Sequence, residues 1–451
     1  MIAGTARPLR RILGLGFGLA LVFGSTVGVG ILRLPGTVAA ALGDRSLIMV
    51  CWTVGGLYAL MGAVAVAELA AMLPQTGGFR VYAQRAFGEG VGFAVGCVDW
   101  LCNVATIAYA AVTAAAFLGV LWSPATAHAR TISILILVAF TGIHWLGLRI
   151  GSSVTALISA TIGLLLMTLV VACFLSAPVA ATNLPPLAMA ADSQPWLSLA
   201  MLFALVPALR SILAAYDGWY SAIYMAEENT NAARTLPRAI IGGTLLVVAL
   251  YLAINLAFLH VLPLPVLAAS QLPAADAARA VLPRGGAGLV TVISLLTVLS
   301  LVNNVILAAP RILFAIGRDG LLAGQTAIVS DGGTPRMALA ATSVIAVVLI
   351  LTGTFAQILA LYAVLFLLFY VSAFLAVFVL RYREPALPRP YRALGYPFST
   401  AIVLLGSVVF LIAAVAEDPR SGFIAAAFVA GCVPAYAWLA RARRVRAQSR
   451  A

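Results

Sequence analysis

The sequence predicts an all-α polytopic membrane protein with about twelve transmembrane helices, and its composition is the first reason. Of the 451 residues, 63% are hydrophobic and only 9% are charged, whereas a soluble domain is about half apolar and one quarter charged. The second reason is a series of apolar stretches, each near the roughly 20 residues that a spanning helix needs. The third is a pair of interruptions within two of these stretches, near residues 26 and 217. We therefore expect one transmembrane domain over residues 1–451.

The predicted spans fall into two consecutive sets of five and a final pair. The first set occupies 12–177, with spans at 12–41, 46–72, 90–121, 131–147 and 153–177. The second occupies 197–380, with spans at 197–227, 238–262, 286–315, 337–355 and 357–380. The last pair, 397–415 and 421–440, lies within 397–440. Between the spans we expect an amphipathic interfacial segment at 78–88, a proline-rich loop at 178–196 and a short helix within 263–285.

The basic residues predict the orientation. All 27 are arginines, and they concentrate in alternate loops, which is typical of the cytoplasmic side of a membrane protein. With the N-terminus inside, that side holds Arg7, Arg10, Arg11, Arg80, Arg85, Arg149, Arg234, Arg238, Arg311, Arg318, Arg336, Arg381, Arg383, Arg389, Arg392, Arg441, Arg443, Arg444, Arg446 and Arg450. The opposite loops hold Arg45, Arg130, Arg279, Arg284 and Arg420. Both termini are therefore expected to be cytoplasmic, and the absence of lysine is typical of a GC-rich bacterial genome, which favours a bacterial inner membrane.

No cluster of residues predicts catalysis, a metal site or a cofactor. The five cysteines form no CxxC pair, and the three histidines show no HExxH or comparable spacing. No nucleophile–base pair is evident either. The net charge of +13 would suggest nucleic acid in a soluble protein, but here the arginines lie between apolar runs and serve topology. An enzyme and a nucleic-acid partner are therefore not expected.

The first interruption is the stretch GSTVGVGILRLPG at 24–36. Three of its four glycines, at 24, 28 and 30, fall within seven positions, although each glycine costs a helix roughly 1 kcal/mol relative to alanine. One explanation is close helix packing of the GxxxG kind between Gly24 and Gly28. The other is that the helix is broken here.

The second interruption is an Asp-Gly pair, Asp217 and Gly218, in the middle of the sixth span. An aspartate near the bilayer centre costs at least a few kcal/mol, so it usually faces a cavity or a partner. Close helix packing does not account for this pair. Because paired interruptions in the first helices of two repeats point to the substrate site of an inverted-repeat transporter, we favour two broken helices.

Broken helices supply the chemistry for binding a zwitterion. Unwound backbone is tolerated at this depth only where it lines a cavity or meets a ligand. The half-helix that starts after Gly28 presents free N–H groups, which suit a carboxylate. The half-helix that ends near Tyr216 presents free carbonyls, which suit an ammonium group. Together they would bind the backbone of an amino acid.

These stretches resemble the amino acid–polyamine–organocation superfamily, especially its L-amino-acid-transporter branch. The glycine-rich stretch looks like the first-helix motif of that family. AYDGWYSAIYMAEENTNAARTLPRAI (215–240) is similar to the sixth helix and following loop of the branch, and LVNNVILAAPRILFAIGRDGLL (301–322) to the eighth helix. MLPQTGGFRVYAQRAFGEGVGF (72–93) adds a family-like loop. The resemblance implies a five-plus-five inverted repeat (LeuT-like) with discontinuous helices 1 and 6, two further helices, alternating access and an amino-acid substrate.

The resemblance also implies positions for the site. The backbone N–H groups of Gly28, Val29 and Gly30 would hold the substrate carboxylate. The carbonyls of Thr26, Ala214 and Asp217 would hold its amine. Further cavity or gate positions are Ser25, Arg33, Asp99, Asn103, Arg210, Tyr216, Gly218, Trp219 and Asn303, and the expected cytoplasmic gate is Glu228 and Arg311. For the last two a structural loop role is an equal alternative.

Departures from the family pattern leave the coupling open. Many sodium-independent members carry a lysine on helix five, where its ammonium stands in for a sodium ion, but here that position is Ile162. Three modes of coupling are left open: exchange with a counter-substrate, proton coupling, and a sodium site that uses the hydroxyl of Ser300 or Thr297. Val29 replaces a common serine, so its hydroxyl is lost while the amide stays.

Two arginines lie on the outer side of the interruptions. Arg33 replaces a small or apolar residue of the family, and Arg210 lies one turn before Ala214, where relatives often carry a bulky aromatic. They would contact an acidic or polar substrate side chain, form an outer gate, or extend into a watery vestibule and pair with a carboxylate such as Asp99. Asp99 and Asn103 share a helix face at i, i+4, as part of the cavity wall or as a helix-packing pair.

The resemblance favours a secondary amino-acid transporter, a permease or an exchanger. The alternative is a polyamine or organic-cation transporter of the same superfamily, because Asp217 and Asp99 would attract cations. The sequence lacks the motifs that a membrane enzyme or a channel would need.

Overall fold

The computed structural model describes residues 9–178, 199–353 and 355–448. Within these ranges the chain is helical, apart from its connecting loops and an isolated bridge between Leu13 and Asn229. The predicted all-α fold class is therefore confirmed. The predicted proline-rich loop lies outside the described residues from residue 179 onward.

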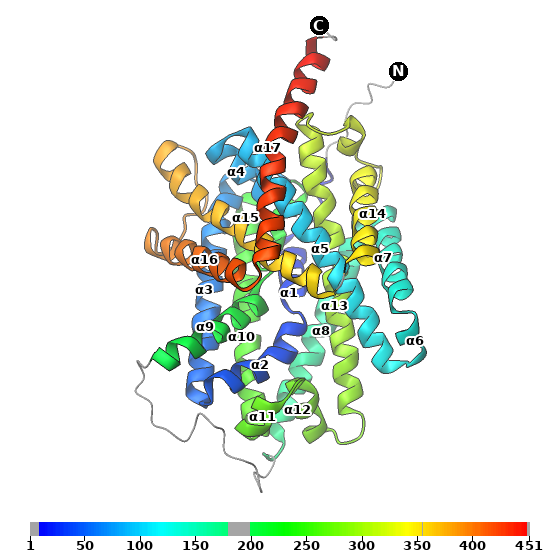
Figure 1. Ribbon diagram of the computed structural model, residues 1–451, viewed down its shortest axis with the longest axis vertical. Coiled ribbons are helices and arrows are strands. Elements are labelled where there is room, and N and C mark those ends of the chain that lie inside the picture. The colour runs from blue at the N-terminus through cyan, green and yellow to red at the C-terminus, as the bar shows by residue number, and fades with distance from the viewer. Residues whose placement is uncertain (1–8, 179–198, 354, 449–451) are drawn as a thin grey trace.

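The helices coincide with the predicted spans (Figure 1). The first part of the chain forms α1 (Leu15–Thr26), α2 (Val29–Leu42), α3 (Arg45–Met72), α4 (Phe79–Phe87), α5 (Glu89–Leu121), α6 (Pro124–Ala127), α7 (Ala129–Leu146) and α8 (Leu148–Leu175). The second part forms α9 (Leu199–Tyr216), the 3-10 helix η1 (Ser221–Glu228), α10 (Ala232–Val261), α11 (Leu264–Ala269), α12 (Pro273–Val281), α13 (Gly286–Arg318), η2 (Gly324–Ala327), α14 (Arg336–Thr352), α15 (Phe355–Arg383), α16 (Phe398–Glu417) and α17 (Pro419–Gln448).

The number of spans is close to the expectation. Among the described residues, nine helices are long and apolar enough to cross a membrane, and the bent pair α1 and α2 makes up to ten. α14, with 17 residues, is a shorter apolar helix, and α9 begins at the edge of a described range. The count of twelve and its division into two repeats stay predictions.

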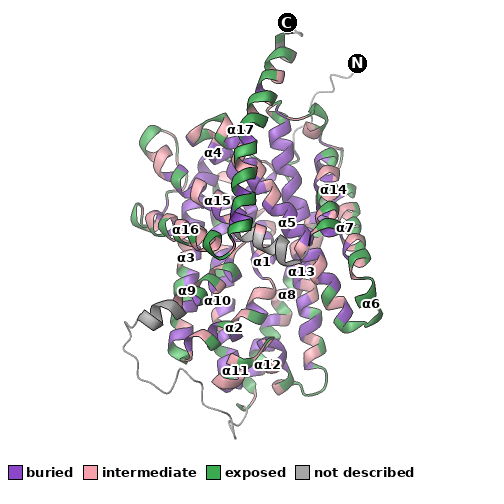
Figure 2. Ribbon diagram, viewed as in Figure 1, coloured by how far each residue is buried: buried purple, intermediate pink, exposed green. Residues whose placement is uncertain are grey.

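The helices surround α1, which packs against α8, α10 and α13 (Figure 1). Figure 2 shows the buried residues concentrated in this interior, while α7, α16 and α17 carry much exposed surface. That surface is apolar: Val138, Leu405 and Phe423 are 56%, 66% and 75% exposed, as lipid contact requires. The first and last described residues, 9 and 448, lie at one end of the molecule, here called the terminal end. α11 and α12 lie at the other, here called the distal end.

Two local expectations can be compared with the structure. The segment predicted to lie at the membrane interface forms the short helix α4, which packs against α5 and α15. Of its two arginines, Arg80 is buried in an ion pair with Asp319, whereas Arg85 is half exposed, and the interfacial position stays a prediction. The single short helix expected within 263–285 is two helices, α11 and α12, and Pro273 starts the second, a position that proline favours.

Candidate functional site

The first span is broken where the glycine-rich stretch predicted a break. α1 ends at Thr26, α2 begins at Val29, and the two axes differ by 45°. Gly28 caps α2 in an extended conformation and supplies no side-chain hydrogen bond to its first amides. The free N–H groups at the start of α2 therefore carry the partial positive charge of a helix N-terminus.

The sixth span is broken at the Asp-Gly pair. α9 ends at Tyr216, a turn follows, and the 3-10 helix η1 starts at Ser221. Gly218 has a φ of +106°, a backbone conformation that residues with a Cβ rarely adopt. The glycine is thus needed for the turn that ends the half-helix.

The two breaks are in direct contact. A Cβ atom on Gly218 would lie 2.4 Å from the carbonyl oxygen of Ser25, and one on Gly30 would lie 3.2 Å from the Cα of Ala215. The hydroxyl of Tyr251, on α10, lies 2.9 Å from the carbonyl oxygen of Thr26 and 3.1 Å from that of Ala215. One buried side chain therefore joins the ends of α1 and α9.

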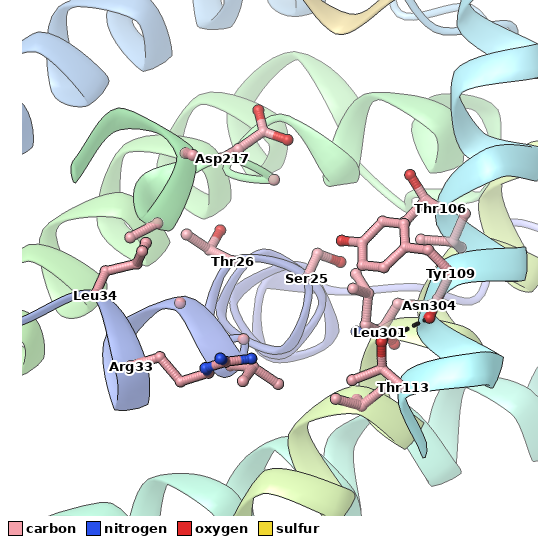
Figure 3. A pocket seen from close by; sticks show the side chains of 18 of the residues that line it. Ser25, Thr26, Arg33, Leu34, Thr106, Tyr109, Thr113, Asp217, Leu301 and Asn304 are labelled. Carbon is pink, nitrogen blue, oxygen red and sulfur yellow. Dashed lines mark hydrogen bonds between the residues drawn. The ribbon is translucent and has the colours of Figure 1, made fainter. Parts of the chain in front are cut away.

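A chamber of about 640 Å³ lies beside these breaks (Figure 3). It is bounded by α1, α2, α5, the end of α9 and α13, and it extends toward α11 and α12 at the distal end. The predicted site residues that line it are Ser25, Thr26, Gly28, Val29, Gly30, Arg33, Asn103, Ala214, Asp217 and Gly218. All six residues whose backbone groups are expected to bind the substrate, from segments nearly 190 positions apart, thus line one space.

Charged side chains are sparse in the chamber. Figure 3 shows Arg33 extending from α2 beneath Ser25 and Thr26, whereas the carboxylate of Asp217 is directed away from both. That carboxylate accepts a hydrogen bond from the hydroxyl of Tyr370, on α15. Asp217 therefore presents its backbone, rather than its charge, to the chamber.

Other predicted residues lie outside the chamber lining. Arg210 forms an ion pair with Glu417 of α16, so its partner is a carboxylate other than Asp99. Trp219 stacks on Tyr370 with ring centroids 5.4 Å apart. Tyr216 packs edge-on against Trp52 and donates a hydrogen bond to its carbonyl oxygen.

Asp99 and Asn103 combine both roles that their spacing suggested. The Asn103 amide donates to the Asp99 carboxylate at 2.9 Å, and the Tyr224 hydroxyl donates to the same oxygen at 2.7 Å. Asp99 is fully buried behind them, while Asn103 and Tyr224 line the chamber. Asp99 thus positions two wall residues without lining the wall itself.

Asn303 supports a wall residue in the same way. Its amide donates to the Thr155 hydroxyl at 2.8 Å, and that hydroxyl donates to the Asn304 side-chain oxygen at 2.9 Å. The ring of His144 contacts Asn303 from the other side at 3.1 Å. Asn304, which the sequence analysis did not select, lines the chamber.

Ion pairs close the terminal end of the molecule. Glu228 and Arg311 form a bidentate pair with both N–O distances at 2.7 Å, and both side chains are at most 2% exposed. Arg318 pairs with Glu227 at 2.8 Å beside them. The structure thus brings the two predicted gate residues together, and their gating role stays a prediction.

The chain before α1 is tied to this closed end. The amide of Leu13 donates to the carbonyl oxygen of Glu228 at 2.9 Å, and the amide of Thr230 donates to that of Leu13 at 3.0 Å. These bonds join the start of the first span to the end of the sixth.

The sequence analysis missed several residues that form or support the site, because single side chains gave weak signals. Tyr251 lies mid-span, where a buried tyrosine needs a partner for its hydroxyl, and that requirement was the available signal. For Asn304 the signal was an Asn-Asn pair within an apolar span. Thr106 and Tyr109 of α5 also line the chamber and follow Asn103 along one helix face.

A helical membrane protein with two touching helix breaks beside a chamber, and with buried ion pairs at one end, has the architecture of a solute transporter. Comparison with known proteins agrees. The family model described as amino acid permease matches residues 18–433. The chain is 28% identical to the serine/threonine exchanger SteT of Bacillus subtilis over 428 residues, covering 92% of this chain and 93% of SteT. It is 24% identical to the mouse b(0,+)-type amino acid transporter 1 over 420 residues, covering 91% of this chain and 84% of the relative. The chain belongs to the amino acid permease family.

Proposed function

We propose that this permease exchanges small neutral amino acids across a bacterial inner membrane by alternating access. The observation that carries the proposal is the contact between the two helix breaks, because it places backbone donors and acceptors on one chamber. The resemblance of the full chain to a serine/threonine exchanger supports both the exchange and the size of the substrate.

The backbone of the substrate would bind between the half-helices. Its carboxylate would accept hydrogen bonds from the amides of Gly28, Val29 and Gly30 at the start of α2. Its ammonium would donate to the carbonyls of Thr26, Ala214 and Asp217. The Thr26 carbonyl also accepts from Tyr251, but a carbonyl oxygen has two lone pairs and can serve both.

The side chain of the substrate would meet a small polar wall. Ser25 Oγ, Ser221 Oγ and Asn304 Nδ2 are buried and have no hydrogen-bond partner among the described residues, and all three residues line the chamber. A buried polar group without a partner costs about 1–3 kcal/mol, so a ligand hydroxyl that reaches these atoms gains affinity. A substrate such as serine or threonine has that hydroxyl.

The closed terminal end favours an outward-facing conformation. If both termini are cytoplasmic, as the arginine distribution predicts, the ion pair of Glu228 with Arg311 seals the cytoplasmic side while the chamber extends toward the outside. Alternation between the two sides would then move the two five-helix repeats, 12–177 and 197–380, relative to each other.

Counter-substrate exchange is the coupling that we favour. Ile162 is fully buried on α8 and supplies no charge. A sodium site would have to use Ser300, whose hydroxyl has no partner among the described residues, and Thr297, whose hydroxyl already donates to Ser294. A proton-coupled mode lacks an ionisable side chain at the position of Ile162.

The geometry weighs against the organic-cation alternative. The carboxylate of Asp217 is directed away from Thr26 and toward Tyr370, and Asp99 is not among the lining residues. A polyamine in the chamber would therefore meet no carboxylate from either residue.

Counterflow in proteoliposomes tests the proposal. Labelled L-serine should accumulate in vesicles preloaded with unlabelled L-serine and much less in empty vesicles. Competing L-alanine should reduce the uptake, whereas L-serine methyl ester and spermidine should not. Two results would contradict amino-acid exchange. One is uptake that needs no internal amino acid. The other is uptake that spermidine inhibits and that L-serine methyl ester inhibits as strongly as L-serine does.

A further inference from the structure

Two cysteines from distant parts of the chain meet between α5 and α17. Cys97, on α5, is half-buried, and Cys432, on α17, is 6% exposed. Both are free cysteines, and a hydrogen bond joins their thiols. We propose that Cys97 and Cys432 form a reversible disulfide that links α17 to α5 and slows transport. The formation of the bond is independent of the transported solute, whereas its effect on transport rests on the proposed function.

Side-chain contacts show how α5 and α17 run past each other. At the terminal end, Glu89 at the start of α5 accepts a hydrogen bond from Arg443 at 2.8 Å and one from Tyr436 at 3.1 Å, both on α17. One turn further along α5, Phe93 packs against Tyr436 with ring centroids 5.9 Å apart. The start of α5 thus meets the last part of α17, and the two helices are antiparallel.

This register places the two cysteines opposite each other. Cys97 lies four residues after Phe93 on α5. Cys432 lies four residues before Tyr436 on α17. Because residues four apart share a helix face and the helices are antiparallel, the contact that follows the Phe93 ring on this face is the one between the two thiols. Cys102, five residues beyond Cys97, points roughly 140° away around α5 and lines the chamber.

The surroundings suit a disulfide better than a metal ion. In the described ranges, no group of three or more His, Cys, Asp and Glu side chains could hold a metal, whereas a structural zinc site needs about four ligands. The helices are also close together, since a Cβ atom on Gly90 would lie 3.4 Å from the ring of Tyr436. A disulfide requires such packing because it spans at most about 7 Å between Cα atoms.

A peroxide is the oxidant for this bond. The Cys97 sulfur, the more exposed of the two, attacks one oxygen of hydrogen peroxide. The O–O bond breaks, Cys97 becomes a sulfenic acid and one water leaves. The Cys432 sulfur then attacks the Cys97 sulfur, so that the S–S bond forms, the S–O bond breaks and a second water leaves. The two thiols give up two electrons and two protons, which the peroxide takes up, and a dithiol reverses the reaction by exchange.

The link would restrain transport because α17 contacts both predicted repeats. α17 packs against α5, which lies in 12–177, and against α15, most of which lies in 197–380. When the repeats move relative to each other, α17 must shift against one of these helices. A covalent bond to α5 leaves the contact with α15 to change alone. α5 also carries Asn103, Thr106 and Tyr109 of the chamber wall, so the restraint acts on the site.

Treatment of the full chain in nanodiscs with hydrogen peroxide tests the proposal. After denaturation, a maleimide–polyethylene glycol shifts the gel band once for each free thiol, so the reduced chain, with five cysteines, should carry five adducts. The oxidised chain should carry three, because one disulfide consumes two of the five thiols, and dithiothreitol should restore the others. Mass spectrometry of the digest should find the peptides of Cys97 and Cys432 joined. In proteoliposomes, L-serine exchange should fall severalfold on oxidation and recover with dithiothreitol.

Variants locate the bond. Cys97→Ala, or Cys432→Ala if the first gives no folded protein, should carry the same number of adducts before and after peroxide, and peroxide should leave its exchange unchanged. Cys173→Ala is the matched control, because Cys173 is another buried cysteine, and it should lose two adducts as the wild type does.

Three results would overturn the inference. They are an oxidised wild type that keeps all its adducts, a Cys97→Ala variant that loses two, and a disulfide between two chains. A disulfide that forms but leaves exchange unchanged would overturn its effect on transport. A reduced chain that shows no exchange would overturn only the proposed function.

Discussion

The hydroxyl of Tyr251 donates a hydrogen bond of 2.9 Å to the carbonyl oxygen of Thr26, the last residue of α1. Tyr251 is fully buried, and its hydroxyl is also within 3.1 Å of the Ala215 carbonyl oxygen. Because the ends of both half-helices depend on this one group, Tyr251 controls where the freed carbonyls of the two breaks point.

Replacement of Tyr251 by phenylalanine should therefore weaken both the fold and the site. Two buried carbonyls lose a donor, which costs about 1–3 kcal/mol of stability. We expect a lower unfolding temperature and a KM for L-serine raised more than tenfold, because the Thr26 carbonyl is a proposed ammonium ligand. Thermal unfolding and proteoliposome exchange measure the two effects. An unchanged KM would remove Tyr251 from the positioning of the site.

Gly218→Ala should abolish exchange. The substitution adds a Cβ that would lie 2.4 Å from the Ser25 carbonyl oxygen at a residue with φ of +106°, so strain of about 1–3 kcal/mol adds to a steric clash. Gly288→Ala is the control, since its added Cβ would meet nothing within 4 Å in α13. The control should match the wild type in exchange and gain up to about 1 kcal/mol in stability. Full activity of Gly218→Ala would mean that the two breaks can separate without loss.

The buried pair of Glu228 and Arg311 predicts a non-additive result. Glu228→Gln alone should destabilise the protein by about 3–5 kcal/mol, because Arg311 is left as an uncompensated buried charge. The double variant Glu228→Leu with Arg311→Met should recover much of that stability and still lose exchange, if the pair must form and separate during alternation. Thermal unfolding and exchange of the three proteins give the comparison. A double variant that exchanges at the wild-type rate would contradict a gating role.

The two arginines near the breaks should behave differently. Arg33 lines the chamber, whereas Arg210 pairs with Glu417 and has a side chain 46% exposed. Arg33→Ala should change the ratio of glutamate to alanine uptake, and Arg210→Ala should change both by the same factor, within about twofold for a surface pair. A selective loss of glutamate uptake in Arg210→Ala would restore the interpretation that this residue contacts an acidic substrate.

The sequence predicted the helices and their breaks because these depend on local chemistry. The glycines around Gly28 and the Asp-Gly pair at 217 are unfavourable in a continuous helix wherever the rest of the chain lies. The length of each apolar run likewise fixes each span. Such features need no knowledge of distant contacts.

The orientation of single side chains depended on distant contacts and was not predictable in the same way. Arg210 meets Glu417 from a helix more than 200 residues later, and the Asp217 carboxylate meets Tyr370 on α15. Spans that are apolar all round give no periodic signal for the face that a residue occupies. For the same reason the sequence did not indicate that Asp99 lies behind Asn103, or that Asn303 lies behind Asn304.

The hydrogen bonds of Leu13 with Glu228 and Thr230 have a practical consequence for protein engineering. They place the beginning of α1 within two peptide units of the Glu228–Arg311 ion pair, so a bulky reporter domain fused shortly before residue 9 would pull directly on the seal. The end of α17 is held by the side chain of Arg443, which pairs with Glu89 and donates to the carbonyl oxygen of Asp319, but Arg444 and Val445 beyond it are exposed. Fluorescent fusions and affinity tags therefore belong at the carboxyl end. Transport kinetics measured on amino-terminal fusions would describe a protein whose ion pair at the terminal end is disturbed.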